Sequence, residues 1–286
     1  RMRSIISLSA NLRINSWLTV QARGSVDYIS DKMRQKFYAS TAPALCGANG
    51  RYIEMDYQET LIYGDVMAMG KRKWEDFALD VAIGGSINDK NVNSTRYDSK
   101  NASLKYANVF NLANIVMNGS ASIDQKIDSR RQLQSVFGTA QVGYQDKVFL
   151  DLTARNDWAS TLAYTSHEKS GFFYPSAGLS FLIDKWIQLP EWISFAKLRG
   201  TYSKVGNDIP QFITNSVSHI TAGGELQAND AAPFKEMEPE MTHSVEVGTE
   251  WRFFQSRLGF NLTYYRTNTH NQFFKLPALA GDMYLS

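Results

Sequence analysis

The sequence predicts an all-β protein, an antiparallel transmembrane β-barrel with long extracellular loops. Three observations predict it. Apolar and polar residues alternate along segments of about ten residues. Short and long connections alternate between these segments, and charged residues recur at the polar positions. Because successive side chains of a strand point to opposite faces, each segment predicts a strand with one apolar and one polar face.

The composition fits such a barrel and excludes a helical membrane protein. Mean hydropathy is -0.32, and no apolar run reaches the roughly 18 residues of a transmembrane helix, so a helical membrane protein is excluded. The formal net charge is +2, which gives no electrostatic argument for a nucleic-acid partner. A barrel remains possible because polar side chains that face its lumen lower the average hydropathy.

About ten strands follow from the alternation. Their apolar side chains recur at every second position, and the third range is the least regular. The ranges are 6–14, 18–28, 52–63, 77–83, 135–144, 148–154, 177–183, 196–202, 245–253 and 258–264.

The connections between these strands alternate in length. Short connections are expected at 15–16, 65–73, 145–147, 184–193 and 255–256, and long polar ones at 30–51, 88–130, 158–172 and 207–241. Outer-membrane barrels have short periplasmic turns and long extracellular loops, whereas a soluble sandwich has no reason for this alternation. We therefore expect the strands to cross an outer membrane.

Charged side chains at the polar positions support a hydrated interior. Buried charges are rare unless they are paired, so these residues need water beside them. A wide barrel with a hydrated lumen supplies it, and so does a sheet with one solvent face. We expect the following to face the lumen: Arg13, Arg23, Asp80, Asp151, Arg155, Lys197, Arg199, Glu246, Glu250 and Arg252.

Aromatic residues lie near the ends of the predicted strands rather than at their centres. Aromatic girdles at both membrane interfaces are typical of outer-membrane barrels, although aromatic residues also cap soluble sheets. We favour a girdle formed by Trp17, Tyr28, Tyr144, Trp192, Trp251, Phe253 and Tyr264.

Four stretches, in order, are similar to one protein family. Residues 131–157, RQLQSVFGTAQVGYQDKVFLDLTARND, resemble a hairpin in the barrel of SusC/RagA-type TonB-dependent transporters of Bacteroidetes outer membranes. Residues 174–180 and 198–207 resemble two further strands of that family. Residues 239–269 resemble a third region of it, through the stretches 239–248, 253–258 and 263–269. Trp158 and Ala159 depart from the family's common pattern.

The resemblance implies a barrel of about 22 strands with an internal plug, in the outer membrane. It also implies import of glycans or oligopeptides, with TonB as the energy source and a SusD-like surface lipoprotein as a lid. Residues 1–286 are then part of one barrel domain, with the plug and the TonB box outside this chain. The implied partners are therefore the lipoprotein, TonB, outer-membrane lipid and the cargo.

No catalytic site, metal site or cofactor is expected. The four histidines (His167, His219, His243 and His270) lack ligand spacing, and Cys46 is the single cysteine. The strand pattern places Asp151 and Glu246 at hydrated lumen positions rather than in an acid–base pair. The acidic run at 236–240 reads as a solvated loop end, because Met237 and Pro239 interrupt the ligand spacing of a calcium loop.

The long loops are the expected place for recognition. Aromatic and polar side chains there are candidates for stacking on cargo or contacting a lid, with loop packing as the alternative. The candidates are Tyr97, Trp158, Tyr164, Phe212 and His219.

Two other functions fit the same strands. A passive outer-membrane porin predicts the same barrel without a plug or a lid. A secreted glycan-binding β-sandwich predicts that the apolar faces pack between two sheets, so that the protein dissolves without detergent.

Overall fold

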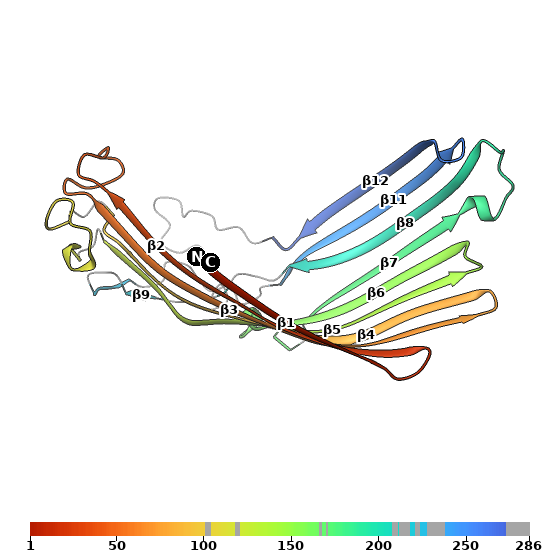
Figure 1. Cartoon of the computed structure of the whole chain (residues 1–286), viewed down its shortest axis with the longest axis horizontal. Helices are drawn as coiled ribbons and strands as arrows, with labels where there is room; N and C mark the ends of the chain where they lie inside the picture. Colours follow the sequence, from red (N-terminus) through yellow and green to blue (C-terminus); the bar gives the residue numbers. More distant parts are fainter. Residues whose placement is uncertain are drawn as a thin grey trace.

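The main feature of the structure is one large antiparallel sheet. A computed structural model describes residues 1–100, 104–117, 121–165, 168–169, 171–207, 211, 218–220, 224–227 and 238–272. Ten strands form the sheet in the order β1-β2-β3-β4-β5-β6-β7-β8-β11-β12 (Figure 1). Strands of this sheet that follow one another in the chain also pair with one another, as in an up-and-down barrel. The all-β prediction is confirmed.

The large sheet consists of β1 (Met2–Arg13), β2 (Leu18–Phe37), β3 (Arg51–Trp74), β4 (Phe77–Asp98), β5 (Ser122–Tyr144), β6 (Val148–Ala159), β7 (Phe172–Leu182), β8 (Ile193–Asn207), β11 (Glu240–Phe253) and β12 (Leu258–His270). A separate hairpin pairs β9 (His219–Ile220) with β10 (Leu226–Gln227). The 3-10 turns are η1 (Leu112–Asn114), η2 (Ser160–Leu162) and η3 (Ile183–Lys185). In the part of the chain described here, no helix has the length and apolar character to cross a membrane.

The connections follow the predicted alternation. Short ones join the strands at 14–17, 75–76, 145–147, 183–192 and 254–257, at the right-hand ends of the strands in Figure 1. Long ones occupy 38–50, 99–121, 160–171 and 208–239. The long connections are shorter than the sequence predicted, because several strands continue beyond their apolar segment.

The third predicted strand is present, but the connection expected after it at 65–73 was wrong. Residues 65–73 do not form a connection, because β3 continues to Trp74 and turns at 75–76, where Glu75 has a φ of 35°. Glycine interrupts the alternation of apolar and polar residues in this part of β3, but the pairing with the neighbouring strands continues. A Cβ on Gly70 would lie 3.2 Å from Cγ2 of Val81, so glycine allows the side chain of the neighbouring strand to pack closely.

One face of the sheet is apolar and exposed. Residues that pair directly lie on the same face, so the strand register places Leu8, Val66 and Val247 on this face. Leu8 is 77% exposed and Leu262 is 59% exposed. Soluble proteins do not expose contiguous apolar surface on this scale, so the face requires lipid or protein against it.

Aromatic side chains border the apolar face near the short turns. The rings of Phe77 and Tyr144 have centroids 5.0 Å apart, and Trp192 stacks on Phe253 at 5.7 Å. This agrees with a girdle at the periplasmic interface, because amphipathic rings prefer the headgroup region.

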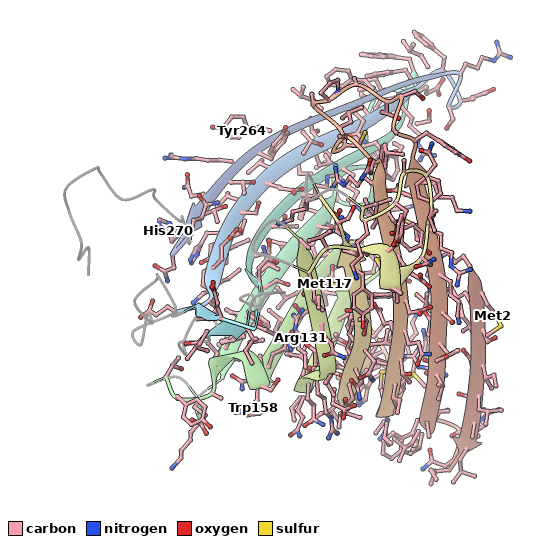
Figure 2. All side chains as sticks on the ribbon, turned by 90° about the vertical axis from the view of Figure 1, so that its left-hand side faces the viewer. Met2, Met117, Arg131, Trp158, Tyr264 and His270 are labelled. Carbon is pink, nitrogen blue, oxygen red and sulfur yellow. The ribbon has the colours of Figure 1, made fainter. Side chains whose placement is uncertain are left out.

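The curvature of the sheet distinguishes an inner side from an outer side. From strand β1 to strand β12 the sheet follows an arc (Figure 2). Met2, Trp158 and Tyr264, which the register assigns to the apolar face, lie on the outer side of the arc, whereas Arg131 lies on its inner side. The apolar face is therefore the outer face of a barrel section.

The strands β2 to β5 are longer than a membrane requires. β3 has 24 residues, β4 has 22 and β5 has 23, whereas a crossing strand needs about 9–11. On the outer face, apolar residues stop at Ile87 of β4 and polar ones begin at Asp89. These strands therefore extend beyond the lipid on the side of the long loops.

We expect a new charge to destabilise the protein on the outer face and to be tolerated on the inner face, even at neighbouring positions. Val247 lies on the outer face and is 56% exposed, while Thr201 lies on the inner face opposite Glu246. We expect Val247→Arg to lower the free energy of unfolding by about 2–4 kcal/mol, because the outer face contacts the bilayer interior. Urea titration of the full-length protein in lipid vesicles measures this. Thr201→Arg is the matched control, and equal losses in both variants would contradict the assignment of the faces.

Candidate transport face and extracellular cap

The inner face of the sheet collects charges that are far apart in the sequence. The register aligns Arg23 with Asp65, then Ser86, Ser135 and Asp157 across β2 to β6. Alternate residues of these strands share the face, and the pairing of β6 to β7, β8 and β11 extends it. Every charge named in advance for the lumen in β2, β4, β6, β8 and β11 lies on it: Arg23, Asp80, Asp151, Arg155, Lys197, Arg199, Glu246, Glu250 and Arg252. Their contact with a water-filled lumen stays a prediction.

One ion pair of this face joins β2 to β3 and has a fully covered carboxylate. Nε of Arg23 lies 3.0 Å from Oδ2 and 3.1 Å from Oδ1 of Asp65. The side chain of Asp65 is 0% exposed, whereas that of Arg23 is 47% exposed. A covered carboxylate needs its partner, so removing Arg23 would leave an uncompensated buried charge.

A second pair lies on β6 in the same row. Arg155 donates from Nε to Oδ1 of Asp157 at 2.7 Å and from Nη2 to Oγ of Ser135 at 2.8 Å. Its guanidinium carbon lies 5.8 Å from the ring centroid of Phe137. These contacts fix the planar guanidinium against the sheet while leaving part of it exposed.

The remaining charges of the face form weaker, more exposed contacts. Lys71 Nζ lies 3.2 Å from Oδ2 of Asp80, and Arg252 Nη2 lies 2.9 Å from Oε1 of Glu250. Lys197 and Glu246 have no ion pair within the residues that the structure describes. Exposed pairs contribute little to stability, so this part of the face keeps charges of both signs available to water or to a ligand.

The charges expected at the lumen did not include two acidic members of this row, Asp65 and Asp157. Asp65 lay in a segment assigned to a connection, so its pairing with Arg23 could not be anticipated. The signal for Asp157 was present, because Arg155 and Asp157 are two residues apart and so share a face of one strand.

On the inner face beyond the apolar band, a tyrosine and a carboxylate form a third group. Burial and a hydrogen bond to Glu59 raise the pKa of Tyr57 to about 12. Lys90 Nζ lies 2.9 Å from Oε2 of the same glutamate. The Tyr57 hydroxyl therefore stays protonated and donates to Glu59 at neutral pH.

Two long connections pack together into an extracellular cap, defined here as residues 38–50 and 104–117 with the adjoining ends of β3 and β4. Leu104 is 0% exposed and packs with Tyr52 and Ile115. The backbone N–H of Ala39 donates to Oδ1 of Asn108 at 2.8 Å, which joins the two connections. The cap has its own small core and is not a loosely solvated loop.

One asparagine organises the second connection of the cap. The amide nitrogen of Asn114 donates to the carbonyl oxygens of Tyr106 at 2.8 Å and Val109 at 2.7 Å. Its Oδ1 accepts from the backbone N–H of Tyr106 at 2.9 Å. Asn114 is 4% exposed, so these bonds satisfy an amide that would otherwise be buried without partners.

A buried carboxylate attaches the cap to the sheet. Asp98 accepts from Nε and Nη2 of Arg51 at 2.8 Å each, from Nη2 of Arg96 at 2.8 Å and from the backbone N–H of Lys100 at 2.8 Å. Burial alone would raise the pKa of Asp98. The hydrogen bonds from Arg51 and Lys100 and the positive charges of Arg51 and Arg96 outweigh burial, so the pKa lies below its ordinary value.

The loop residues proposed for recognition lie in different environments. Tyr97 packs against the core of the cap. Trp158 donates from Nε1 to the carbonyl oxygen of Lys169 at 3.1 Å. Tyr164 is 77% exposed and has a φ of 68°. Phe212 and the side chain of His219 lie outside the described residues. Of the three whose side chains are described, Tyr164 is the most exposed, and a ligand contact by any of the five stays a prediction.

No group of metal ligands occurs among the residues that the structure places. His243 and His270 are near each other, with ring centroids 5.5 Å apart, but both lie on the outer face.

The sequence pattern of the family described as "TonB dependent receptor-like, beta-barrel" matches residues 3–285. The chain belongs to this family. TonB-dependent receptors are outer-membrane receptors and transporters rather than enzymes, so the expected location and the expected lack of enzymatic activity are confirmed at the level of the family.

Solved structures of TonB-dependent receptors share the fold. A structure of the RagAB peptide transporter has a TM-score of 0.75 at 19% identity, covering 97% of this chain and 32% of the other. The ferric citrate transporter FecA gives 0.56 at 12% identity over 94% of this chain and 35% of the other. The pyoverdine receptor FpvA from Pseudomonas aeruginosa PAO1 gives 0.53 at 16% identity, covering 93% and 36%. No curated protein matches the sequence significantly.

The chain thus spans about a third of the length of these receptors. The expectation of a section of a larger TonB-dependent receptor barrel is confirmed by the family match and by the open ten-stranded sheet.

The contacts of Asp98 predict that the local stability of the cap depends on this residue. We expect Asp98→Asn to lower the opening free energy of residues 104–117 by about 3–5 kcal/mol, because it removes the negative charge between Arg51 and Arg96. Hydrogen exchange of these residues, compared with that of β11, measures this. Asp146→Asn is the matched control, because Asp146 pairs with Lys73 at 3.4 Å and the two side chains are 71% and 66% exposed. Equal exchange in both variants would contradict the anchoring role.

The lowered pKa of Asp98 predicts how the stability of the cap changes as pH falls. Because folding lowers the pKa of Asp98, the stabilisation is present above the unfolded value of about 3.9 and is lost as pH falls through the folded value. We expect the protection of residues 104–117, which is their exchange rate relative to the intrinsic rate at each pH, to fall below about pH 4 in the native protein. Asp98→Asn should lack that fall, and an identical pH profile of protection in the variant would assign it to another group.

Proposed function

We propose that the full-length protein containing this chain is a TonB-dependent importer of oligopeptides or glycans. The proposal rests on one observation. The chain is a barrel section of this family, with an apolar outer face and an inner face that carries charges of both signs. The RagAB structures favour oligopeptides, because they are described as structures of a peptide transporter. An oligopeptide carries an ammonium group and a carboxylate, so a surface with charges of both signs suits it.

The inner face contributes many weak contacts rather than one tight site. Arg155 is held by Asp157 and Ser135 yet is partly exposed, so it can bind a carboxylate without a large rearrangement. Glu246 and Lys197 present charges of opposite sign on the same face, at positions four pairs apart along β8 and β11. Weak contacts of this kind allow cargo to enter and also to leave. In the proposed mechanism TonB, acting through a region outside this chain, displaces a plug and opens this path.

We further propose that the cap contacts a SusD-like lipoprotein lid. The core of the cap and the hydrogen bond from Ala39 to Asn108 hold its two connections together. The cap also exposes apolar side chains to solvent, with Tyr106 71% exposed and Leu45 50% exposed. Exposed aromatic residues on a preorganised surface suit a protein partner, since little conformational entropy is lost on binding.

The two other functions considered from the sequence are less well supported. A β-sandwich requires a second sheet over the apolar face, and the described residues form one large sheet and one short hairpin. A passive porin has the same strands, but the chain matches the TonB-dependent receptor family.

Import is tested by uptake of a labelled oligopeptide into cells that produce the full-length protein. We expect uptake to require TonB, and Arg155→Gln to reduce it several-fold by removing a cation from the inner face. Arg34→Gln is the matched control, because Arg34 lies on the outer face and pairs with Glu54 at 3.0 Å. The amount of each variant at the cell surface is measured in parallel. Uptake that persists without TonB would support a porin, and uptake of a labelled oligosaccharide alone would assign the cargo to glycans.

A further inference from the structure

Basic residues gather at one place on the outer face, directly beyond the apolar band. Four of them, Lys204 of β8, His243 of β11, and Arg266 and His270 of β12, are called here the basic cluster. The register pairs His243 with Lys204 on one side and with Asn268 on the other. The rings of His243 and His270 have centroids 5.5 Å apart. His270 lies on the outer side of the arc in Figure 2.

The cluster lies at the boundary between lipid and water. On β8 the outer-face residues run from Ala196 to Tyr202 and are followed by Lys204, and on β12 they run from Leu258 to Tyr264 and are followed by Arg266. Tyr202 and Tyr264 are therefore the last apolar positions below the cluster. Tyrosine at this level is typical of a membrane interface, so the cluster is placed at the depth of lipid headgroups.

Elsewhere on the outer face beyond the apolar band, Lys32, Arg34 and Arg130 are paired with carboxylates, whereas Nζ of Lys36 lies 5.8 Å from the ring centroid of Phe110. Arg130 donates from Nε to Oδ1 of Asp89 at 2.9 Å. Lys32 Nζ lies 3.6 Å from Oδ1 of Asp56, and Arg34 Nη2 lies 3.0 Å from Oε1 of Glu54. The register places each of these pairs on the outer face of β2 to β5.

The basic cluster differs because it has no carboxylate partner within the described part of the chain. Lys204 and Arg266 form no salt bridge there, and the contact of His243 is with a hydroxyl, since its Nδ1 lies 2.9 Å from the oxygen of Tyr202. Glu238, which precedes β11, accepts from the side-chain amide of Asn271 at 2.7 Å. Within the described residues, no carboxylate neutralises the positive charge of Lys204 and Arg266.

We propose that the basic cluster binds the phosphate of a phosphorylated lipid headgroup in the outer leaflet of the membrane. Lys204 and Arg266 lie on the two sides of β11 and supply charge, and His243 between them supplies an additional hydrogen-bonding group. Lipid chains then lie against the apolar residues of the same strands. This interaction is independent of the cargo, because it uses the face opposite to the transport face. Unpaired cations at headgroup depth attract anionic lipid, and each phosphate oxygen accepts charge-assisted hydrogen bonds.

The proposal is tested by lipid retention in the full-length protein. Protein purified in detergent is mixed with lipid A that carries two phosphates, and bound lipid is counted by native mass spectrometry. We expect Lys204→Gln combined with Arg266→Gln to reduce retention at least tenfold, because each cation at headgroup depth contributes several-fold to affinity. The native protein should retain dephosphorylated lipid A as weakly as the double variant retains lipid A with two phosphates.

The matched control is Lys32→Gln combined with Arg34→Gln, which removes the same charge from the same face. Because these residues are already paired with carboxylates, we expect retention to remain within about twofold of the native protein. Equal loss in both double variants would reduce the effect to net charge and overturn the proposal. Equal retention in the native protein and in the first double variant would also overturn it, as would equal retention of the two forms of lipid A. Heat-modifiable migration on a gel verifies that each variant is folded.

Discussion

The structure depends on one constraint, which is that backbone N–H and C=O groups in a bilayer have no water to bind. Each strand crossing lipid must satisfy these groups through neighbouring strands. The continuous ladder from β1 to β12 does this for every interior strand of the sheet. β1 and β12 each have one neighbour among the described residues, and a barrel in lipid has no free edge. Their outer edges therefore pair with strands beyond the described sheet, which agrees with the share of the receptors that this chain covers.

The ladder also explains why the two faces differ so sharply. If the register of a strand shifted by one residue, its inner-face charges would face lipid and its apolar side chains would face the lumen. The resulting penalty holds the register even where the sequence is irregular. Gly70, for example, interrupts the alternation of β3 but is paired on both sides, with Leu18 and Val81. The covered pair of Arg23 and Asp65 is a consequence of the same register, because it joins residues 42 positions apart that lie directly opposite.

These constraints also show which features could be predicted from the sequence. Strands, faces and the alternation of loop lengths were predictable, since they follow from a period of two and from composition. The second half of β3 was not, because Gly64, Gly70 and the basic residues 71–73 hide its period. The partner of Arg23 could not be found either, since pairing across strands depends on register. The cap was missed for a different reason. Leu104 and Ile115 lie in a polar stretch without periodicity, and only their tertiary contact shows that they form a core.

The extension of β2 to β5 beyond the lipid links the remaining features. It carries the cap away from the membrane, and there its outer-face charges are neutralised internally, as Arg34 is by Glu54. In the part of the chain that the structure describes, β8, β11 and β12 are shorter, with 15, 14 and 13 residues respectively. Their first polar residues on the outer face lie at the headgroups rather than above them. A cation in that position does not need an internal carboxylate, because the membrane supplies negative charge. The difference in strand length therefore accounts for both the paired charges on one side of the sheet and the unpaired basic cluster on the other.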